Sequence, residues 1–550
     1  MRTLIFLFAL AGATPPASGT PVVKTLEKAA DTNIELTIIG TSDLHGRIAQ
    51  LPAFGGYLAA IRSARPGRVL TVDAGDVWQG TLESDSNEGE VAVRAYDLLG
   101  YNAVAIGNHE FDFGPVGPRS TALAGQDSRG ALKARVLEAQ KTFPFLAANL
   151  TENGKALAWP NVKAHTIVSL AGVQVGIIGV TTMDTPTTTI AANFAGLAVT
   201  PLAETVQREA KAVRSEGAQV VLLVAHAGGR CTKLADESDT SSCEMGSEIF
   251  KLAQALLPGT VDAIVAGHMH SGVAQDINGI PITESFAQGQ SFGRIDLSFD
   301  PHTAKVTAHK IFAPQKIESK GVYEGQPLVA NAAVQAAIGP ALAAAEVKRQ
   351  ALIGSELAEM FERSYGAEST LGNFLTSVML ASDKRAKIAI TNGGGIRADL
   401  PAGPLRYGAV YNALPFDNRV VLVTMSGAAV RELYAHNLVS KGGMFSIAGA
   451  AVKAECKEQK LVVSLTWPNG KSIADNDQLT VATNDFLATG GDGFSGSHML
   501  TPIDEAPVLR DTLVDYFHSH PGPLHARDWF HPDAPRMPTT ARPWSCSRAP

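Results

Sequence analysis

The segment Ile34-Glu-Leu-Thr-Ile-Ile-Gly-Thr-Ser-Asp-Leu-His-Gly46 runs an apolar strand directly into Asp43 and His45, two side chains of the kinds that bind metal ions. The same order occurs at four further places: Arg68–Asp73 before Asp76, Asn102–Ile106 before Asn108 and His109, Val220–Ala225 before His226, and Val261–Ala266 before His268 and His270. Because the carboxyl ends of neighbouring strands in α/β proteins meet at one rim of a sheet, we expect these side chains to converge. The first half of the chain therefore predicts a single site.

The region around these strands has the alternation that is typical of an α/β layer. From residue 37 to about residue 299, strands alternate with helix-like segments such as Val91–Leu99 and Leu202–Glu216. Ile280–Thr283 and Arg294–Ser298 alternate apolar and polar residues, which predicts hairpin strands near the end of this domain.

The length of 550 residues favours two domains. The Ala-rich segment Val329–Leu352 is expected to be a mainly helical connector, broken or kinked at Gly339-Pro340. Further strands are predicted after it, at Lys387–Thr391, Val420–Met425 and Gln478–Thr483. The expected division is a first domain at 34–325, a linker at 326–353, a second domain at 354–518, and a mobile tail rich in Pro and His at 519–550.

The composition and the N-terminus bear on partners and location. The formal net charge is −7 and no run of Lys and Arg occurs, so neither a nucleic-acid polymer nor an anionic membrane is expected as partner. Arg2, the apolar run Leu4–Leu10 and the small residues Ala17-Ser18-Gly19 predict a cleavable signal at residues 1–19, and hence a secreted or periplasmic protein. The apolar run is too short to span a membrane, and the polar end Arg542–Pro550 argues against a glycolipid anchor.

Four cysteines are present, which allow three pairings or four free thiols. Cys231 and Cys243 are placed to close a short loop after His226, and Cys456 and Cys546 to hold the tail. Export favours disulfides over free thiols, but the sequence does not select among the pairings.

The polar residues at the five strand ends match the donors that hard or borderline divalent ions choose. Asp43 and His45, like His268 and His270, are two residues apart, so both members of a pair can point at one ion on an extended loop. A carboxylate such as Asp76 can bridge two cations, the arrangement that stabilises an in-line displacement at phosphorus. The alternative, unrelated polar loop residues, does not explain why all of them follow strands.

This order of motifs resembles that of the calcineurin-like metallophosphoesterases, and together with the second half of the chain it resembles their secreted 5′-nucleotidase branch. The resemblance implies an N-terminal four-layered αββα metallophosphoesterase sandwich and a C-terminal α/β substrate-binding domain. It also implies two divalent metal ions. One would be bound by Asp43, His45, Asp76 and His270, and the other by Asp76, Asn108, His226 and His268.

The resemblance further implies that His109 binds no metal and faces the phosphate, with Asp112 hydrogen-bonded behind it. Chemistry agrees, because hydrolysis builds charge on the phosphoryl and leaving oxygens and a protonated imidazole offsets that charge. A carboxylate three residues away can orient the ring and favour its cationic form. The alternative for His109 is an ordinary histidine at the start of a helix.

The second half of the chain offers groups suited to a nucleotide. Three glycines in Asn392-Gly-Gly-Gly-Ile-Arg397 permit close approach of a ligand to the backbone, and Arg397 offers a fork for phosphate oxygens. Phe416 and Phe486 lie in separate loop-like segments and can hold a flat base between them, while Asp492 can accept hydrogen bonds from ribose hydroxyls. The alternative is that both rings are core residues. The resemblance implies the same roles and adds a base contact for Asn392.

One segment departs from the family pattern. The family usually places phosphate-binding arginines just before or at a Leu-Gly-Asn segment, here Leu371-Gly-Asn373. The corresponding positions carry Tyr365 and Ala367, and Arg363 stands slightly out of register. Either Arg363 reaches the phosphate by another route, as a further phosphate contact, or the phosphate is bound more weakly.

The sequence thus predicts a secreted, two-metal 5′-nucleotidase that releases phosphate from nucleoside 5′-monophosphates. The resemblance extends the substrates to nucleoside di- and triphosphates, UDP-sugars or cyclic nucleotides. The alternatives are a thiosulfate-releasing hydrolase of the same architecture and a catalytically inert nucleotide-binding protein. The donors admit zinc, manganese, cobalt, iron or calcium, and the pattern indicates neither a base preference nor an oligomeric state.

Overall fold

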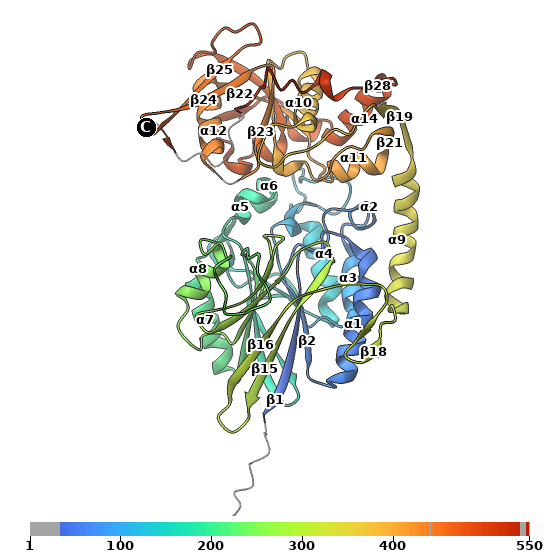
Figure 1. Cartoon of the computed structure of the whole chain (residues 1–550), viewed down its shortest axis with the longest axis vertical. Helices are drawn as coiled ribbons and strands as arrows, with labels where there is room; N and C mark the ends of the chain where they lie inside the picture. The colour runs from blue at the N-terminus through green and yellow to red at the C-terminus, as the bar shows by residue number, and fades with distance from the viewer. Residues whose placement is uncertain (1–32, 441, 539–545, 549–550) are drawn as a thin grey trace, which may run out of the picture.

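The computed structural model describes residues 33–440, 442–538 and 546–548, so the predicted signal at residues 1–19 lies outside the described residues. The chain forms two domains stacked along the long axis, with helix α9 (Ala332–Gln350) running along one side between them (Figure 1). No helix among the described residues is long and apolar enough to cross a membrane.

The N-terminal domain is built on two large sheets. The strands of the first sheet are, in spatial order, β16 (Lys305–Lys316), β15 (Ser291–Asp300), β1 (Ile34–Thr41), β2 (Val69–Asp73), β3 (Ala103–Ala105), β4 (Phe145–Leu146) and β7 (Val162–Lys163). Those of the second are β13 (Gly272–Ile277), β14 (Ile280–Ser285), β12 (Ala263–Ala266), β11 (Val220–His226), β9 (Val173–Thr181) and β8 (His165–Leu170). Two smaller sheets contain β10 (Leu197–Val199), β5 (Leu150–Glu152) and β6 (Lys155–Ala156), and β17 (Val322–Tyr323) and β18 (Gln326–Pro327).

Helices cover the outer faces of both large sheets. The helices of this domain are α1 (Leu51–Ala64), α2 (Leu82–Asp85), α3 (Glu90–Leu99), α4 (Gly130–Glu138), α5 (Thr185–Thr188), α6 (Ala191–Phe194), α7 (Leu202–Ser215) and α8 (Glu248–Ala255). Side chains of α1 and α3 form one core with the first sheet, and those of α7 and α8 form another with the second. The expected helices at Val91–Leu99 and Leu202–Glu216 are therefore present as α3 and α7.

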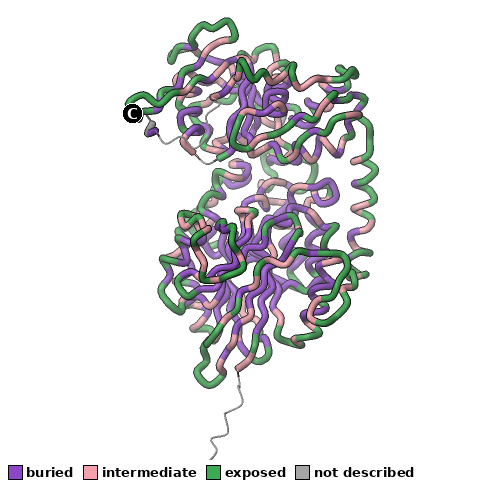
Figure 2. The backbone as a smooth tube through the Cα atoms, viewed as in Figure 1, coloured by how far each residue is buried: buried purple, intermediate pink, exposed green. Residues whose placement is uncertain are grey.

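The two sheets pack against each other because their central strands are apolar on both faces. Along β11, Val220, Leu222 and Val224 enter the core between the sheets, whereas Val221 and Leu223 face the helices. This alternation follows from the two-residue period of a strand. The result is the four-layered αββα sandwich that the family resemblance implied, with buried residues concentrated in its centre (Figure 2).

The prediction that all five ligand-bearing strands share the rim of one sheet is wrong. β1, β2 and β3 belong to the first sheet, whereas β11 and β12 belong to the second. The strand ends still meet because the sheets lie face to face and end together at the same edge of the sandwich. Buried strands of a single sheet and of two stacked sheets have the same apolar pattern, so the sequence cannot distinguish the two arrangements.

The C-terminal domain is a second α/β unit. Its main sheet contains, in order, β23 (Phe445–Ala448), β20 (Ile388–Asn392), β26 (Gln478–Asn484), β22 (Val420–Ser426) and β27 (Ser497–Met499). Two smaller sheets contain β21 (Gly403–Arg406), β19 (Leu352–Leu357) and β28 (Pro523–Leu524), and β24 (Ala451–Lys457), β25 (Lys460–Thr466) and β29 (Ser547–Arg548). The helices are α10 (Thr370–Ser382), α11 (Tyr407–Ala413), α12 (Gly427–Val439), α13 (Asp485–Ala488) and α14 (Leu509–Ser519). Cores lie on both faces of the main sheet, with α12 on one face and α10, α11 and α14 on the other.

The connector between the domains differs from its prediction. The connector α9 is one uninterrupted helix with Pro340 inside it, so it is not broken at Gly339-Pro340. Val334 and Ile338 belong to the core that α1 and α3 form on the first sheet, and this packing offsets the hydrogen bond that Pro340 cannot donate. The helix is therefore held by the N-terminal domain along its first half.

The described part of the expected tail packs against the C-terminal domain. β28 pairs with β19, and Met537 is buried in the core beneath α12. The structure contains the disulfides Cys231–Cys243 and Cys456–Cys546, one of the three pairings that the sequence allowed, and the second joins the chain end to β24. The weak periodicity of this segment predicted a mobile tail. The structure differs because single apolar side chains and a disulfide are enough to fix an irregular segment in place.

Candidate metal centre and interdomain cleft

Six of the predicted ligands lie on short loops that leave strand ends, and His226 is the last residue of β11. Five of them, Asp43, His45, Asp76, His268 and His270, have positive φ angles between 48° and 83°. Asp and His tolerate this left-handed region better than most residues with a Cβ atom, although it is still unfavourable for them. The loops therefore turn back sharply at the ligands, and this brings the side chains of distant segments together.

Asp43, His45 and His270 form one group whose ligand atoms all lie within 4.8 Å of one another. The Nδ1 atom of His45 lies 3.0 Å from the carbonyl oxygen of Gln79, and it therefore carries the proton. Its Nε2 atom then presents a lone pair, and it faces Nε2 of His270 at 3.0 Å. Burial lowers the pKa of His45 well below its ordinary value, so the imidazole is neutral and available as a ligand.

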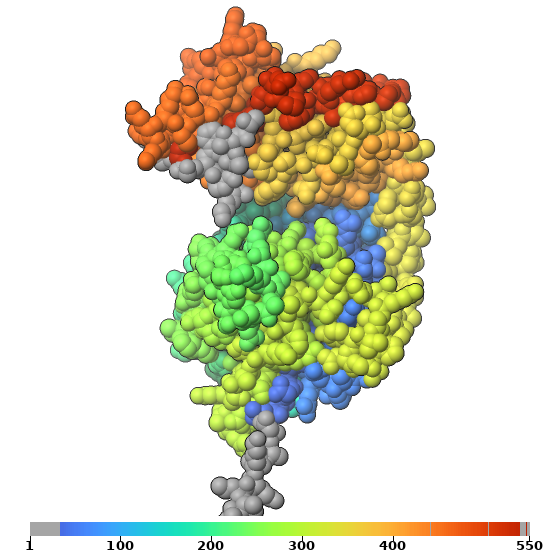
Figure 3. Space-filling view, in the orientation of Figure 1, coloured from blue at the N-terminus to red at the C-terminus, as the bar shows by residue number. Residues whose placement is uncertain are grey.

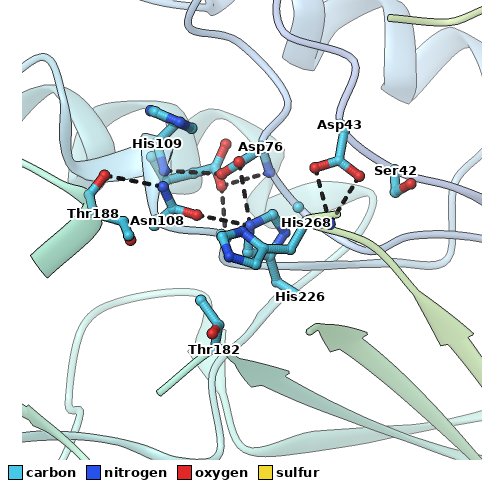
Figure 4. Close-up of polar contacts among 12 residues, drawn as sticks. Ser42, Asp43, Asp76, Asn108, His109, Thr182, Thr188, His226 and His268 are labelled. Carbon is cyan, nitrogen blue, oxygen red and sulfur yellow. Dashed lines mark hydrogen bonds and ion pairs between the residues drawn. The ribbon is translucent and has the colours of Figure 1, made fainter. Parts of the chain in front are cut away.

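Asp76, His226 and His268 form the second group (Figure 4). His226 donates from Nδ1 to the carbonyl oxygen of Ala74 at 2.8 Å, which directs Nε2 inward. Nε2 lies 2.9 Å from Oδ1 of Asn108 and 3.2 Å from Oδ2 of Asp76. Burial opposes protonation of His226, but the charge of Asp76 raises the pKa of this histidine to about 10. Oδ1 of Asn108 and Oδ2 of Asp76 thus create a position beside Nε2 of His226 where positive charge is favoured.

Asp76 lies between the two groups. Its Oδ2 atom is 3.2 Å from Nε2 of His226 in one group and 3.8 Å from Nε2 of His45 in the other. Burial raises the pKa of Asp76, but the nearby histidines outweigh this effect and hold it well below the ordinary value. The donor types, the inward-facing ring nitrogens and the shared carboxylate fit two divalent cations.

His109 stands beside this centre with its ring held from behind. Its backbone N–H donates to Oδ1 of Asp76 at 2.8 Å, and its Nδ1 atom lies 2.5 Å from Oδ2 of Asp112. The hydroxyl of Thr189 donates to the other oxygen of Asp112 at 2.9 Å. Burial lowers the pKa of His109, but the charges of Asp112 and Asp76 together raise it above the ordinary value.

Three buried carboxylates that hold the ligand loops were not predicted from the sequence. Glu110 accepts backbone N–H groups from Gly107, Asp76 and Val77 at 2.6–2.9 Å. Glu284 accepts those of Gly229 at 2.9 Å and Met269 at 3.2 Å, and Asp73 accepts that of Gly75 at 2.8 Å. A sequence signal was present for Asp73, which ends the predicted strand Arg68–Asp73, and for Glu110, which directly follows His109, but not for Glu284, which lies near the end of β14 away from any motif.

The metal-type centre opens into a cleft of about 2060 Å³ between the two domains, where the surface is hollowed (Figure 3). Its lining includes the predicted residues of both halves: Asp76, Asn108, His109, His268, His270, Arg363, Asn392, Arg397, Phe416, Phe486 and Asp492. Arg397 reaches across the cleft, with Nη2 at 3.4 Å from Nε2 of His109. The ring of Phe416 stacks on His109 with centroids 5.7 Å apart, and the guanidinium of Arg397 lies 5.1 Å from the Phe416 centroid.

Asn392 and Asp492 form a second polar cluster in the same cleft. Nδ2 of Asn392 donates to Oδ2 of Asp492 at 2.7 Å, and Asn484 donates to Oδ1 of Asn392 at 3.2 Å. Phe486 packs flat against Gly491, where a Cβ atom would lie 2.5 Å from the ring. Phe416 and Phe486 are both partly exposed in the cleft, so the structure does not bury them as ordinary core residues.

Arg363 and Tyr365 occupy the wall where the sequence departs from the family pattern. Arg363 lines the cleft and donates from Nη1 to the carbonyl oxygen of Ile396 at 3.3 Å, one residue before Arg397. Tyr365 also lines the cleft and is 52% exposed. A further arginine that the sequence analysis missed, Arg119, lines the opposite wall. Its Nε and Nη2 atoms are buried without a hydrogen-bond partner among the described residues.

The αββα sandwich with Asp, His and Asn donors at its edge agrees with the class that the sequence resembles, the calcineurin-like metallophosphoesterases. The sequence profile of the calcineurin-like phosphoesterase family matches residues 36–272, and that of the 5′-nucleotidase C-terminal domain matches residues 345–498. The chain therefore combines a calcineurin-like phosphoesterase region with a 5′-nucleotidase C-terminal region, the two parts that the resemblance implied.

Relatives of similar length and of greater length were found. The chain is 25% identical to the protein UshA of Yersinia enterocolitica, over 91% of this chain and 93% of that protein. It is 26% identical to the trifunctional nucleotide phosphoesterase YfkN of Bacillus subtilis over 84% of this chain, but it spans only 32% of that longer protein.

Solved structures share the fold. A 5′-nucleotidase precursor from Thermus thermophilus superimposes with a TM-score of 0.69 at 24% identity, covering 89% of this chain and 97% of that one. The sulfate thiohydrolase SoxB of Thermus thermophilus superimposes with a TM-score of 0.66 at 15% identity, covering 91% of this chain and 96% of that one. Because enzymes with different substrates share this architecture, the fold does not select the substrate.

Proposed function

We propose that this protein is a two-metal phosphohydrolase that releases phosphate from nucleoside 5′-monophosphates. The observation that carries the proposal is the position of Asp76 between two groups of imidazole and carboxylate donors, directly across a cleft from Arg397 and Phe416. A phosphate at the donors would lie within reach of Arg397, and the attached nucleoside would extend toward the second domain.

The residues that would hold the cations are the seven predicted ones: Asp43, His45, Asp76 and His270 for one, and Asp76, Asn108, His226 and His268 for the other. Zinc, manganese and cobalt all suit these donors. When bound, two such cations supply the Lewis-acid charge that stabilises an in-line displacement at phosphorus.

His109 and Arg397 would carry the remaining charge stabilisation. Asp112 fixes the tautomer of His109 by its contact with Nδ1, so Nε2 is the atom directed toward the cleft and toward Arg397. In its protonated form His109 can donate from Nε2 to a phosphoryl or leaving oxygen, while the fork of Arg397 binds the phosphoryl oxygens.

The substrate grip would come from the C-terminal domain. A base would lie between Phe416 and Phe486, with Asn392 at its edge, and the ribose hydroxyls would donate to Asp492. Arg363 is the further phosphate contact. Nucleoside di- and triphosphates, UDP-sugars and cyclic nucleotides are additional substrates under the same proposal, and the proposed site of action is outside the cytoplasm, in line with the predicted signal.

The test is phosphate release by the purified protein from AMP, UMP, ATP, UDP-glucose and an aryl phosphate, with and without a chelator and after adding back single divalent metals. We expect chelator-sensitive release from AMP or UMP well above release from the aryl phosphate. Release from the aryl phosphate alone would refute the nucleotide grip but keep the metal centre. Binding of AMP without release would favour an inert nucleotide-binding protein.

A thiosulfate-releasing hydrolase is the second candidate, because the SoxB structure shares this fold and because Tyr365 and Ala367 stand where the family carries arginines. Release of sulfate or thiosulfate from an S-sulfonated or thiosulfonated cysteinyl peptide, with no phosphate released from AMP, would establish that candidate instead.

A further inference from the structure

A short segment of the N-terminal domain contacts both the metal-type centre and the C-terminal domain. Asp85, the last residue of α2, lies nine positions after Asp76. Its carboxylate accepts the backbone N–H of Gly80 at 3.0 Å and 3.3 Å, and Gly80 packs against the backbone of His45. The same carboxylate accepts a short hydrogen bond from the hydroxyl of Tyr411, which belongs to the other domain.

On the far side of this contact, Tyr411 is linked to the loop that carries Phe416. Arg510 of α14 lies over the Tyr411 ring at 4.4 Å from its centroid. It donates to the carbonyl oxygens of Leu414 at 2.9 Å and Phe416 at 3.3 Å, and it pairs with the carboxylate of Asp417. One buried guanidinium thus fixes the whole turn from 414 to 417.

This turn sets the position of Phe416 relative to the proposed catalytic histidine. Phe416 stacks on His109 from the other domain. The carbonyl oxygen of Pro415, one residue earlier, accepts a long hydrogen bond of 3.4 Å from Gln79, whose own carbonyl oxygen faces Nδ1 of His45. The metal-ligand loop and the Phe416 turn therefore meet at two points, one through Gln79 and one through Asp85.

Apolar packing surrounds the Asp85–Tyr411 contact. Leu82 of α2, Ala345 of α9 and Tyr411 of α11 form a buried cluster at the place where these three helices meet (Figure 1). Tyr411 is buried and Asp85 is half-buried where both line the cleft, so loss of the hydroxyl would leave the Asp85 carboxylate without this donor from the other domain. The contact therefore depends on the present orientation of the two domains.

We propose that Asp85, Tyr411 and Arg510 form a positioning network that couples the placement of the Phe416 turn to the metal-ligand loop across the domain boundary. All three line the cleft, but none is among the proposed metal ligands or phosphate contacts. They determine the position of the cleft wall that carries Phe416 relative to the wall that carries His109. The inference rests on the proposed function, because its effect is read in the hydrolysis of nucleotides.

The test is a double-mutant cycle between Tyr411→Phe and Asp85→Ala, measured as kcat/KM for AMP in the metal-loaded full chain. Tyr434→Phe is the matched control: Tyr434 is a buried tyrosine of α12 in the same domain, and its hydroxyl donates to the carbonyl oxygen of Ser446 at 3.5 Å, away from Arg510 and from the residues that line the cleft. Metal content and the thermal unfolding midpoint of each variant are measured alongside.

We expect Tyr411→Phe to lower kcat/KM for AMP about tenfold at unchanged metal content, the size typical for loss of a buried hydrogen bond. The control should stay within about twofold, and the double variant should be no worse than the poorer single variant, because the two changes remove one interaction. Losses that multiply in the double variant, an equal loss in Tyr434→Phe, or unchanged kcat/KM in Tyr411→Phe would each overturn the network.

Failure of the proposed function gives a different result. In that case the wild-type chain releases no phosphate from AMP, and the unfolding midpoints decide the network alone. Non-additive midpoint shifts for Asp85→Ala and Tyr411→Phe would retain it as an interdomain contact, and additive shifts would refute it.

Discussion

Replacing His109 tests the proposed chemistry most directly, because the structure also predicts progressively smaller losses of activity for variants of Asp112 and Thr189, the two residues behind it. Thr189 donates to Asp112 at 2.9 Å, and Asp112 contacts Nδ1 of His109 at 2.5 Å, so each residue acts on the next. Loss of a general acid or of a charge-stabilising donor costs about 10²–10⁴-fold in rate. For His109→Ala we therefore expect kcat for AMP to fall about 10³-fold, or about 4 kcal/mol at 1.36 kcal/mol per decade.

The expected loss of kcat becomes smaller with distance of the replaced residue from the cleft. Asp112→Ala leaves the imidazole in place but removes the group that orients it and favours its charge, so a loss of about 10–100-fold is expected. Thr189→Val removes one hydrogen bond to Asp112 and should cost about fivefold or less. The assay is steady-state phosphate release from AMP at saturating metal, with metal content determined for each variant.

The matched control is His165→Ala, because His165 also pairs with a carboxylate, Glu209, at 2.9 Å, but lies on β8 at the edge of the second sheet. Its kcat should stay within about twofold of wild type. The assignment of His109 would be refuted if His109→Ala kept more than a tenth of the wild-type kcat, or if Asp112→Ala were more damaging than His109→Ala at equal metal content.

Three further predictions concern substrate, metal and stability. Asp492→Ala should raise KM for AMP about tenfold while changing KM for an aryl phosphate about twofold or less, because only the nucleotide presents ribose hydroxyls; equal changes would show a general distortion. Glu284→Gln should weaken metal binding about tenfold in a chelator titration, because the carboxylate holds the backbone N–H groups of Gly229 and Met269 next to the His268–His270 loop. Unchanged metal affinity would contradict that role. Removing Cys456–Cys546, which spans 90 positions, should lower the free energy of unfolding in urea by about 4–5 kcal/mol, against about 3 kcal/mol for Cys231–Cys243, which spans 12; the reverse order would argue against a loop-entropy origin.

The clustering of the candidate ligands could be predicted from the sequence because each lies at the end of an apolar strand or within a few residues after it. Strand ends such as that of β11 at His226 are defined by apolar runs, and the structure brings these ends together. The strand pattern alone could not predict the arrangement in two sheets, because β2 and β11 are buried on both faces and have the same pattern that strands of one sheet would have; only the resemblance to a known family implied it.

The residues that the sequence did not reveal are those that act through tertiary contacts. Glu284 lies in β14 with no neighbouring motif, and its role depends on loops that lie more than ten positions away in sequence. Tyr411 and Asp85 are 326 positions apart, and neither lies in a recognisable pattern. Local periodicity carries no information about such pairs, whereas metal ligands, which must be clustered after strand ends, leave a local signal.

The ligand loops also explain why these residue types recur at the strand ends. Asp43, His45, Asp76, His268 and His270 combine a donor side chain with a left-handed backbone, at a cost of order 1–3 kcal/mol each for a residue with a Cβ atom. Asp and His are enriched among the residues that tolerate this conformation, so the same side chain supplies the turn and the ligand. Buried acceptors offset the cost, since Glu110 alone binds three backbone N–H groups of two ligand loops. A glycine at any of these five positions would make the turn easier but would remove the donor, so function rather than stability accounts for the residue at each position.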